Sequence, residues 1–365
     1  MQRFAFMIHP LKVKDIARKF PLANIMPESV LEGLFRRVPP LTVSKITGIR
    51  SATGAEAEGW FVACPMTARQ MVELPEKVVL DKIIQTGRKA EELGAPLLGL
   101  GAFTAVVGDA GITVARALGI PVTTGNSYTV ATALEGIEYA ANLLGQDLQK
   151  SRIAVLGATG SIGKACARIL ASQGRDVELV GRDRVRLEEL AAELRSAYGV
   201  PAAVSTDLSE SLPRADVVVA VTSAIDAVVR PEDLKRGAIV CDVSRPRNVS
   251  VAVAEARDDV FVFEGGVIEV PGQVDFGFNF GFPPGTAYAC MSETMILALE
   301  NRYESFSLGR DLDVDKIREI QGLAAKHGFR LAGLRSFERA VTDEYIHRVR
   351  VASGRVKTPI FVSSS

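Results

Sequence analysis

Residues 153–170, IAVLGATGSIGKACARIL, read as an apolar strand, a glycine-rich turn and the start of a helix. Gly157, Gly160 and Gly163 follow the spacing GxxGxxG. The first glycine permits the tight turn, the second lets a pyrophosphate approach the backbone, and the third lets the helix pack closely on the sheet. The amino terminus of the helix then faces the phosphates. The stretch predicts a dinucleotide site, to which we also assign Thr159, Ser161 and Ile162.

The chain around this stretch predicts an α/β fold with a Rossmann-type, doubly wound parallel sheet. Six short apolar runs follow one another: RIAVLGA, VELVGRD, AAVSTD, VVVAVTS, AIVCDVS and VFVFEGG. The first two are followed by helical patterns. Near-continuous apolar strands alternating with helices are typical of a parallel sheet covered on both faces. We place this NADP-binding domain at residues 131–285 and assign Thr222, after the fourth run, to its cofactor site.

The flanking segments predict a separate α/β substrate domain. Residues 46–64 have the pattern of a hairpin, residues 75–93 that of a helix, and YTVATALEGIEYAANLLG (128–145) that of a helix leading into the nucleotide domain. We place the substrate or catalytic domain at 1–130. Residues 270–285 are expected to form a loop, and residues 286–365 to form helices that carry the nucleophile and return to the substrate domain.

Composition narrows the class of protein. The chain has 365 residues, 47% of them hydrophobic, and its formal net charge is zero, which favours neither nucleic acid nor an anionic membrane as partner. It has no apolar run long enough to span a bilayer, and its amino terminus does not resemble a signal peptide. Four widely spaced cysteines without a CxxC pair predict reduced thiols and a cytoplasmic protein. Three histidines, none near a cysteine in sequence, predict no metal site.

The residues after the second apolar run bear on the choice of cofactor. An acidic residue there would bind the ribose 2′-hydroxyl of NAD, whereas an arginine accommodates the 2′-phosphate of NADP. The chain has Arg182 followed by Asp183. A guanidinium at this place can stack on adenine and bind phosphate, so we favour NADPH. Asp183 leaves NADH as the alternative.

Cys290 is predicted to lie in the first turn of a helix. FPPG (282–285) cannot be helical, and the run from Ala287 to Leu299 contains neither Gly nor Pro. Cys290 is then either a packed apolar residue or a nucleophile. A free thiol of pKa about 8.5 is only about 3% ionised at pH 7. A helix terminus lowers that pKa by at most about 1.5 units, so we expect a neighbouring cation or donor, with His327 as a candidate.

Other residues are weaker candidates. Cys64, before Pro65, is the competing nucleophile, although a core position at a strand end fits it better, and Cys166 and Cys241 fit buried positions. GLGAFT and TTGNS combine glycine turns with hydroxyl and amide groups. Four phenylalanines, at 276, 278, 280 and 282, alternate with Gly or Asn and either line an acyl tunnel or anchor a loop. We predict that the substrate is lined by Phe103, Thr124, Asn126 and Tyr128.

The order of domains resembles the shikimate dehydrogenase architecture. That family uses a lysine two residues beyond a proline, and an aspartate in the turn before the linking helix. The resembling stretches here are FVACPMT and TTGNSYT, which place Thr67 and Tyr128 at those two positions. Both proton-transferring residues are absent. Their absence speaks against hydroxyl oxidation of that kind. A shikimate- or amino-acid-type dehydrogenase without a covalent intermediate is the alternative function, and a nucleotide-sensing protein without turnover is a third possibility.

A closer resemblance covers nearly the whole chain. The sequence is similar to the long-chain acyl-(acyl-carrier-protein) reductases, which make fatty aldehydes from acyl thioesters with NADPH. The shared segments are SATG (51–54), GAFTAV (101–106), TTGNSYT (123–129), GATGSIG (157–163), GGVIE (265–269), AC (289–290), FSLGR (306–310) and HGF (327–329). The resemblance implies that Cys290 carries the acyl group. Tyr128 replaces a histidine, and the Phe-rich loop and about thirty residues after HGF are further departures.

The resemblance also implies a partner. The thioester donor would be acyl carrier protein or acyl-coenzyme A, and transient membrane contact is compatible with a lipid substrate. A carrier protein is acidic, so a basic surface should receive it. The end of the chain supplies candidates for that surface, although a solvated tail is the simpler account: His347, Arg348, Arg350, Arg355 and Lys357.

Overall fold

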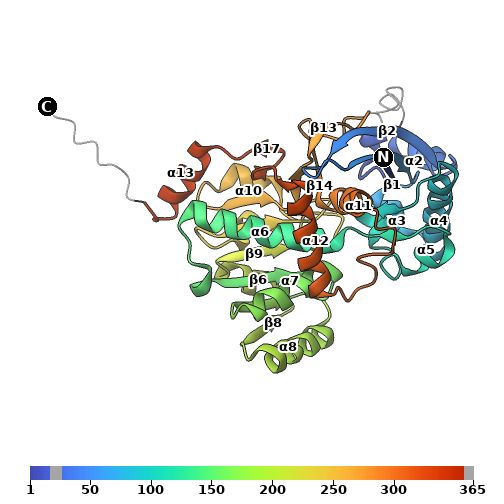
Figure 1. The fold of residues 1–365 in the computed structure, drawn as a ribbon. Coiled ribbons are helices and arrows are strands. Elements are labelled where there is room, and N and C mark those ends of the chain that lie inside the picture. The colour runs from blue at the N-terminus through green and yellow to red at the C-terminus, as the bar shows by residue number, and fades with distance from the viewer. Residues whose placement is uncertain (17–26, 357–365) are drawn as a thin grey trace. The chain divides into compact units, whose positions relative to one another are not determined.

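The computed structural model describes residues 1–16 and 27–356, and the chain forms two compact units (Figure 1). Unit 1 comprises Met1–Thr132 and Gly266–Ala332, and unit 2 comprises Ala133–Gly265 and the chain from Gly333 onward. The boundary near residue 132 falls inside helix α6 (Asn126–Leu144). The other two differ from our expectation, because the chain re-enters unit 1 at Gly266 rather than 286 and rejoins unit 2 at Gly333.

Unit 2 contains a six-stranded parallel sheet. Its order is β11-β10-β9-β6-β7-β8, with every neighbouring pair parallel. The strands are β6 (Arg152–Leu156), β7 (Asp176–Val180), β8 (Ala202–Ser205), β9 (Val217–Ala220), β10 (Ile239–Asp242) and β11 (Phe261–Glu264). These are the six apolar runs, and the predicted fold class is confirmed. The strand order reverses between β6 and β9, where sheets of this kind bind ligands beyond the carboxyl ends of the strands.

Helices and a short hairpin complete unit 2. They are α7 (Ser161–Ser172), α8 (Arg184–Tyr198), α9 (Leu208–Ser211), α10 (Val251–Ala256), β16 (Arg335–Ser336), β17 (Arg339–Ala340) and α13 (Asp343–Ala352). Tyr345 of α13 stacks on Phe261 with ring centroids 5.3 Å apart. Its hydroxyl also donates to Val260 O and accepts from Val262 N, both at 3.1 Å. These contacts bind α13 to edge strand β11, which is why the end of the chain belongs to unit 2.

Unit 1 has a mixed six-stranded sheet in the order β13-β2-β3-β1-β4-β5. The strands are β1 (Gln2–Ile8), β2 (Leu41–Arg50), β3 (Glu56–Ala63), β4 (Leu98–Leu100), β5 (Val122–Thr123) and β13 (Gly272–Asp275). The predicted hairpin is the antiparallel pair β2–β3. Strand β13 lies in the segment that we expected to be a loop. It pairs with β2 because Gly48 has no side chain: a Cβ there would lie 2.0 Å from Gln273 O.

Helix α11 (Ala289–Leu299) packs on strands β1 and β4 of unit 1. Ten of its eleven residues are buried. Gly99 of β4 permits this approach, since a Cβ at that position would lie 2.1 Å from Thr294 Oγ1. The apolar run predicted from sequence therefore forms a core helix, with Cys290 in its first turn.

The remaining elements of unit 1 are short strands and surface helices. A three-stranded sheet is formed by β12 (Val267–Glu269), β14 (Thr286–Tyr288) and β15 (Arg330–Leu331). The helices are α1 (Val13–Ile16), α2 (Glu28–Phe35), α3 (Ala68–Glu73), α4 (Glu76–Glu92), α5 (Ile112–Ala117) and α12 (Val314–His327). Across the described part of both units, none of the helices combines the length and apolar composition that crossing a bilayer requires.

Candidate functional site

The turn between β6 and α7 in unit 2 requires glycine at two positions, because backbone atoms of other residues lie too close there for a side chain. Gly157 has φ +85°, and a Cβ there would lie 2.8 Å from Val221 O. A Cβ on Gly163 would lie 2.3 Å from Gly157 O. Gly160 is the N-cap of α7 and offers no side chain to satisfy its first N–H groups, which suits them to bind an anion. The cradle fits a pyrophosphate, while the individual contacts of Thr159, Ser161 and Ile162 remain predictions.

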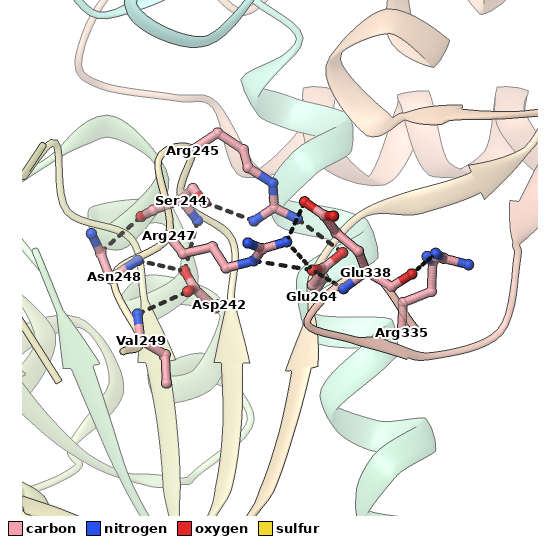
Figure 2. A network of polar contacts seen from close by, with 9 residues as sticks. All are labelled: Asp242, Ser244, Arg245, Arg247, Asn248, Val249, Glu264, Arg335 and Glu338. Carbon is pink, nitrogen blue, oxygen red and sulfur yellow. Dashed lines mark hydrogen bonds and ion pairs between the residues drawn. The ribbon is translucent and has the colours of Figure 1, made fainter. Parts of the chain in front are cut away.

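Thr222 belongs to a hydrogen-bonded network at the carboxyl ends of β9 and β10 (Figure 2 shows its β10 part). Asn248 Oδ1 accepts from Thr222 N and from Ser244 Oγ, both at 2.8 Å. The Asp242 carboxylate accepts from the N–H groups of Ser244 (3.2 Å), Asn248 (3.3 Å) and Val249 (2.9 Å). Burial raises the pKa of Asp242, against the effect of Arg245 and these N–H donors. The loop after β10 is therefore fixed to the segment after β9.

Two arginines follow this network in sequence. Arg245 Nη2 lies 3.2 Å from Glu264 Oε2, and Arg247 Nη2 lies 2.9 Å from Glu264 Oε1 and 2.8 Å from Glu338 Oε1 (Figure 2). The carboxylates neutralise much of the positive charge. We did not predict any of these residues. The available signal was the polar segment DVSRPRN, which directly follows a buried strand.

The segment after β7 contains the residues that distinguish the two cofactors. Asp183 is the N-cap of α8: its Oδ1 accepts from Arg186 N at 3.2 Å, and its Oδ2 lies 3.3 Å from Arg186 Nε. Arg182 is exposed and forms no ion pair within the described residues. Because the Asp183 carboxylate serves α8, Arg182 is the side chain better placed to meet a ligand here.

Cys290 lies at the amino terminus of α11 in unit 1. Tyr288 is the N-cap and supplies no side-chain hydrogen bond. Gly125, with φ +73°, packs directly on Cys290, because a Cβ on Gly125 would lie 2.3 Å from Cys290 Cα. Cys290 is half-buried, whereas the other three cysteines have no exposed surface. Cys290 is therefore the one cysteine of the four that reaches the surface, while its thiol group itself is buried.

The electrostatic environment of Cys290 differs from our expectation. Burial raises the pKa of its thiol to about 12, and the Glu293 carboxylate acts in the same direction. The backbone N–H groups of Met291, Cys290 and Ala102 oppose this by stabilising the thiolate. The expected lowering of the pKa is therefore wrong. The titratable side chain that acts on the thiol is the acid Glu293, and the N–H donors act in the opposite direction.

His327 is not the neighbour of Cys290 that we considered. Its Nδ1 lies 2.7 Å from Ser51 Oγ, and its Nε2 lies 2.6 Å from Glu300 Oε1. Glu300 is the C-cap of α11, ten residues beyond Cys290 and so about 15 Å along the helix. The buried imidazole links the SATG turn to the carboxyl ends of α11 and α12, which is a structural role.

The TTGNSYT turn is held to α11 by Glu293, a residue that we did not predict. Thr123 Oγ1 donates to Glu293 Oε1, and Tyr128 N donates to Oε2 at 2.8 Å. Glu293 has no exposed surface. The signal in the sequence was a single acid in the otherwise uncharged helix ACMSETMILAL, because glutamate is rarely buried without a specific role.

The predicted substrate-lining residues lie in two turns of unit 1. They are buried, with exposed fractions of 4% for Phe103, 0% for Thr124, 6% for Asn126 and 3% for Tyr128. The first turn is fixed by His9, whose Nε2 accepts from Phe103 N at 3.1 Å. Burial lowers the pKa of His9 to about 4, against the effect of Pro10 O and Asp15, so the ring is neutral at pH 7. Substrate contact by these four residues remains a prediction.

The phenylalanines after β13 form a row of rings. Phe276 stacks on Phe61 at 6.0 Å and contacts Phe280 edge-on at 5.1 Å. Phe282 contacts Phe280 at 5.7 Å and the Tyr288 ring at 4.4 Å. Phe276 is buried and anchors the loop, whereas Phe280 and Phe282 are half-buried. The row ends at the N-cap of α11.

Several weaker candidates have structural roles. Thr67 caps α3 through Gln70 N (3.3 Å) and donates to Glu32 Oε1 (3.1 Å). Burial raises the pKa of Cys64 to about 12. Arg348 lies over the Tyr345 ring within α13, whereas Arg355 donates to Gly237 O at 2.7 Å and so binds the segment after α13 to the rest of unit 2. Lys357 is outside the described residues. Among those described, no cluster of three or more His, Cys, Asp or Glu side chains could hold a metal ion.

The raised pKa predicts how Cys290 reacts with an alkylating agent. Only the thiolate reacts, so with a pKa of about 12 the rate with iodoacetamide should rise about tenfold per pH unit from 7 to 9.5. An ordinary cysteine, with a pKa of about 8.5, would instead approach a plateau by pH 9.5. The site of labelling is read by peptide mass, with Cys290→Ser as the blank. A plateau below pH 9 would contradict the buried-thiol description.

Comparison with known proteins places the chain among NAD(P)-dependent oxidoreductases. Residues 138–264 match the family model for shikimate / quinate 5-dehydrogenase. This match covers most of the unit 2 sheet and ends before Cys290. A short-chain dehydrogenase from Sphingobium yanoikuyae in complex with NADPH is 30% identical over 19% of this chain and 32% of its own, with a TM-score of 0.17.

Two curated relatives cover most of the chain. Aminotransferase PigE from Serratia sp. is 33% identical over 363 residues, which are 96% of this chain and 41% of PigE. The chain thus spans less than half of that relative. Long-chain acyl-(acyl-carrier-protein) reductase from Synechococcus elongatus is 30% identical over 306 residues, which are 80% of this chain and 87% of the reductase. Since identity at this level extends over nearly the whole reductase, the chain belongs to the long-chain acyl-(acyl-carrier-protein) reductase family.

Proposed function

We propose that this chain reduces a long-chain acyl thioester to a fatty aldehyde with NADPH, through an acyl group carried on Cys290. The observation that carries the proposal is the setting of the Cys290 sulfur. It lies at a helix amino terminus, belongs to the one half-buried cysteine, and is approached by the N–H groups of Met291, Cys290 and Ala102. These donors stabilise the anionic sulfur that attacks a carbonyl carbon. The 30% identical relative is named for this reaction.

The acylation step follows from the chemistry of the thiol. Cys290 Sγ forms a bond to the thioester carbonyl carbon, the bond from that carbon to the carrier sulfur breaks, and the thiol proton ends on the carrier thiol. The same N–H groups of α11 and Ala102 can hold the carbonyl oxygen as it becomes negative. Gly125 packs on the Cys290 main chain and adds no side chain next to it, since a Cβ there would lie 2.3 Å from Cys290 Cα. One difficult reduction is thereby divided into two easier steps.

The cofactor site is proposed in unit 2. Gly157, Gly160 and Gly163 would cradle the pyrophosphate, Arg182 the 2′-phosphate, and Thr222 would lie near the nicotinamide half. When bound, NADPH supplies the hydride that, with one proton, converts the acyl group to aldehyde and restores the Cys290 thiol. The donor is acyl carrier protein or acyl-coenzyme A. Thr67 and Tyr128 provide no substitute for the Lys/Asp pair of a shikimate-type dehydrogenase, which disfavours that alternative.

The proposal is tested by the mass of the intact protein. Brief incubation with palmitoyl thioester, without NADPH, should add one acyl group, and later addition of NADPH should remove it with release of aldehyde. Palmitoyl-coenzyme A and palmitoyl-carrier protein are tested in parallel to identify the donor. Absence of an adduct with both donors, together with hydride transfer to a small carbonyl compound, would instead favour the dehydrogenase.

Cofactor choice gives a separate prediction. Arg182→Ala should weaken NADPH binding about 10- to 100-fold, because a hydrogen bond to a charged group contributes roughly 1.5–3 kcal/mol. Binding of NADH, which has no 2′-phosphate, should change less than about twofold. The control is Arg184→Ala, at an exposed arginine that pairs with Glu188 on α8. Equal losses for both nucleotides would remove Arg182 from the phosphate site.

A further inference from the structure

Glu293 is a buried acid whose presence the acyl-transfer proposal does not explain. It has no exposed surface and makes no ion pair among the described residues. Burying an unpaired carboxylate is unfavourable unless hydrogen bonds compensate for the lost water. Burial raises the pKa of Glu293, and hydrogen bonds from Thr123, Tyr128 N, Ser307 and Gly125 N act against this by stabilising the carboxylate.

These bonds join three segments around Cys290. Glu293 is three residues beyond Cys290 on α11. Residues at this spacing are neighbours on the surface of a helix, so the two side chains lie side by side. Its partners include Thr123 at the end of β5, Gly125 in the turn that follows, and Tyr128 in the first turn of α6. Ser307 comes from a third segment, and its backbone oxygen accepts from Thr124 Oγ1. The carboxylate is the centre at which this turn is tied to α11.

The turn matters because Gly125 lies against the Cys290 main chain. A shift of a few tenths of an ångström would change the space above the sulfur, since the hypothetical Gly125 Cβ already lies 2.3 Å from Cys290 Cα and 2.4 Å from its Cβ. Glu293 is also the titratable side chain that acts on the thiol. The other groups that act on the thiol are the uncharged backbone N–H groups of Met291, Cys290 and Ala102.

We propose that Glu293 is a positioning residue, which holds the Thr123–Tyr128 turn against Cys290 and sets the charge beside its sulfur. The two effects act on different properties. Holding the turn favours productive placement of a thioester carbonyl over the sulfur. The negative charge disfavours the thiolate, so it protects the thiol from reagents that the site does not position. The first effect rests on the proposed function, whereas the second can be measured without any acyl substrate.

The experiment compares Glu293→Gln and Glu293→Asp with wild type. Glu293→Gln removes the charge and keeps the length. Its alkylation by iodoacetamide at pH 8 should become about 3- to 10-fold faster, because tenfold corresponds to one pKa unit of the thiol. Its acylation by palmitoyl thioester should become at least about tenfold slower, because the turn loses an acceptor for its N–H and O–H donors. Glu293→Asp keeps the charge, so it should alkylate at the wild-type rate and acylate slowly.

The matched control is Glu178→Gln in unit 2. Glu178 is also buried, 2% exposed, and is bound by Ser211 Oγ at 3.0 Å and Arg214 Nη2 at 3.3 Å. This variant should leave both rates of Cys290 unchanged. NADPH binding and thermal melting are recorded for each variant, to establish that unit 2 is folded and to measure the loss of stability.

The outcomes separate the two proposals. Faster alkylation with slower acylation in Glu293→Gln supports the positioning role. Unchanged rates, or a parallel loss of both that follows the loss of melting temperature, overturn it. If wild type is never acylated while Glu293→Gln still alkylates faster, the acyl-transfer proposal fails and the charge effect of Glu293 stands.

Discussion

Replacement of Cys290 by serine is expected to abolish both the acyl adduct and aldehyde formation, with a loss of at least about 1,000-fold in kcat. A serine hydroxyl is a far weaker nucleophile than a thiolate, and His327 is engaged by Ser51 and Glu300 at the far end of α11, so it does not activate the hydroxyl. NADPH binding should be unchanged, because the glycine cradle belongs to unit 2. The measurements are intact mass, NADPH oxidation and NADPH fluorescence titration.

Cys64→Ala provides the control for this experiment. Cys64 is the competing thiol in unit 1, is fully buried, and has a pKa raised to about 12 by burial. Its replacement should leave adduct formation intact, with a modest cost in stability from the lost side-chain volume. An adduct that persists in Cys290→Ser and disappears in Cys64→Ala would move the nucleophile to Cys64 and would falsify the mechanism proposed above.

Gly163→Ala is expected to reduce NADPH affinity about 10- to 100-fold and to lower the melting temperature. The added methyl group would lie 2.3 Å from Gly157 O, 2.9 Å from Gly157 C and 3.0 Å from Ala158 Cα. All three are backbone atoms, so no rotamer change relieves the clash. Either α7 or the turn after β6 must move, and both form the pyrophosphate cradle. Overpacking of this kind costs roughly 1–3 kcal/mol.

Gly322→Ala is a matched control with the opposite expected sign. Gly322 lies inside α12, and a Cβ there meets no atom within 4 Å. Alanine favours the helix over glycine by up to about 1 kcal/mol, so this variant should melt at a higher temperature and bind NADPH normally. If Gly163→Ala binds NADPH with wild-type affinity, the proposed cradle is not the nucleotide site.

The residues that surround Cys290 show why much of its chemistry could not be predicted from the sequence. The turn at Ala102, the turn at Gly125 and the helix start at Cys290 are separated by many residues, yet all contribute to one environment. Sequence spacing identified each turn separately but not their contact. It also suggested His327 as the partner, because a histidine is the usual helper of a cysteine. The titratable side chain that acts on the thiol, Glu293, lies within an otherwise apolar helix and was not predicted.

The sequence by itself determined the nucleotide fold. Strands β6 to β11, helices α7 and α8, and the glycine turn were all predicted, because apolar runs, helix caps and glycine spacing are local signals that survive without tertiary information. The position of Cys290 in the first turn of α11 followed equally from FPPG and the apolar run after it.

Only the tertiary structure decided how the thiol behaves and where the end of the chain belongs. The pKa of Cys290 depends on burial and on groups from two separate segments, the start of α11 and the turn at Ala102, which only the packing of the chain brings together. The small strands β12, β14 and β15 are too short to carry a periodic signal of their own and form because partners distant in sequence supply their hydrogen bonds. Likewise α13 belongs to unit 2 because Tyr345 completes the edge of β11, a contact across more than eighty residues.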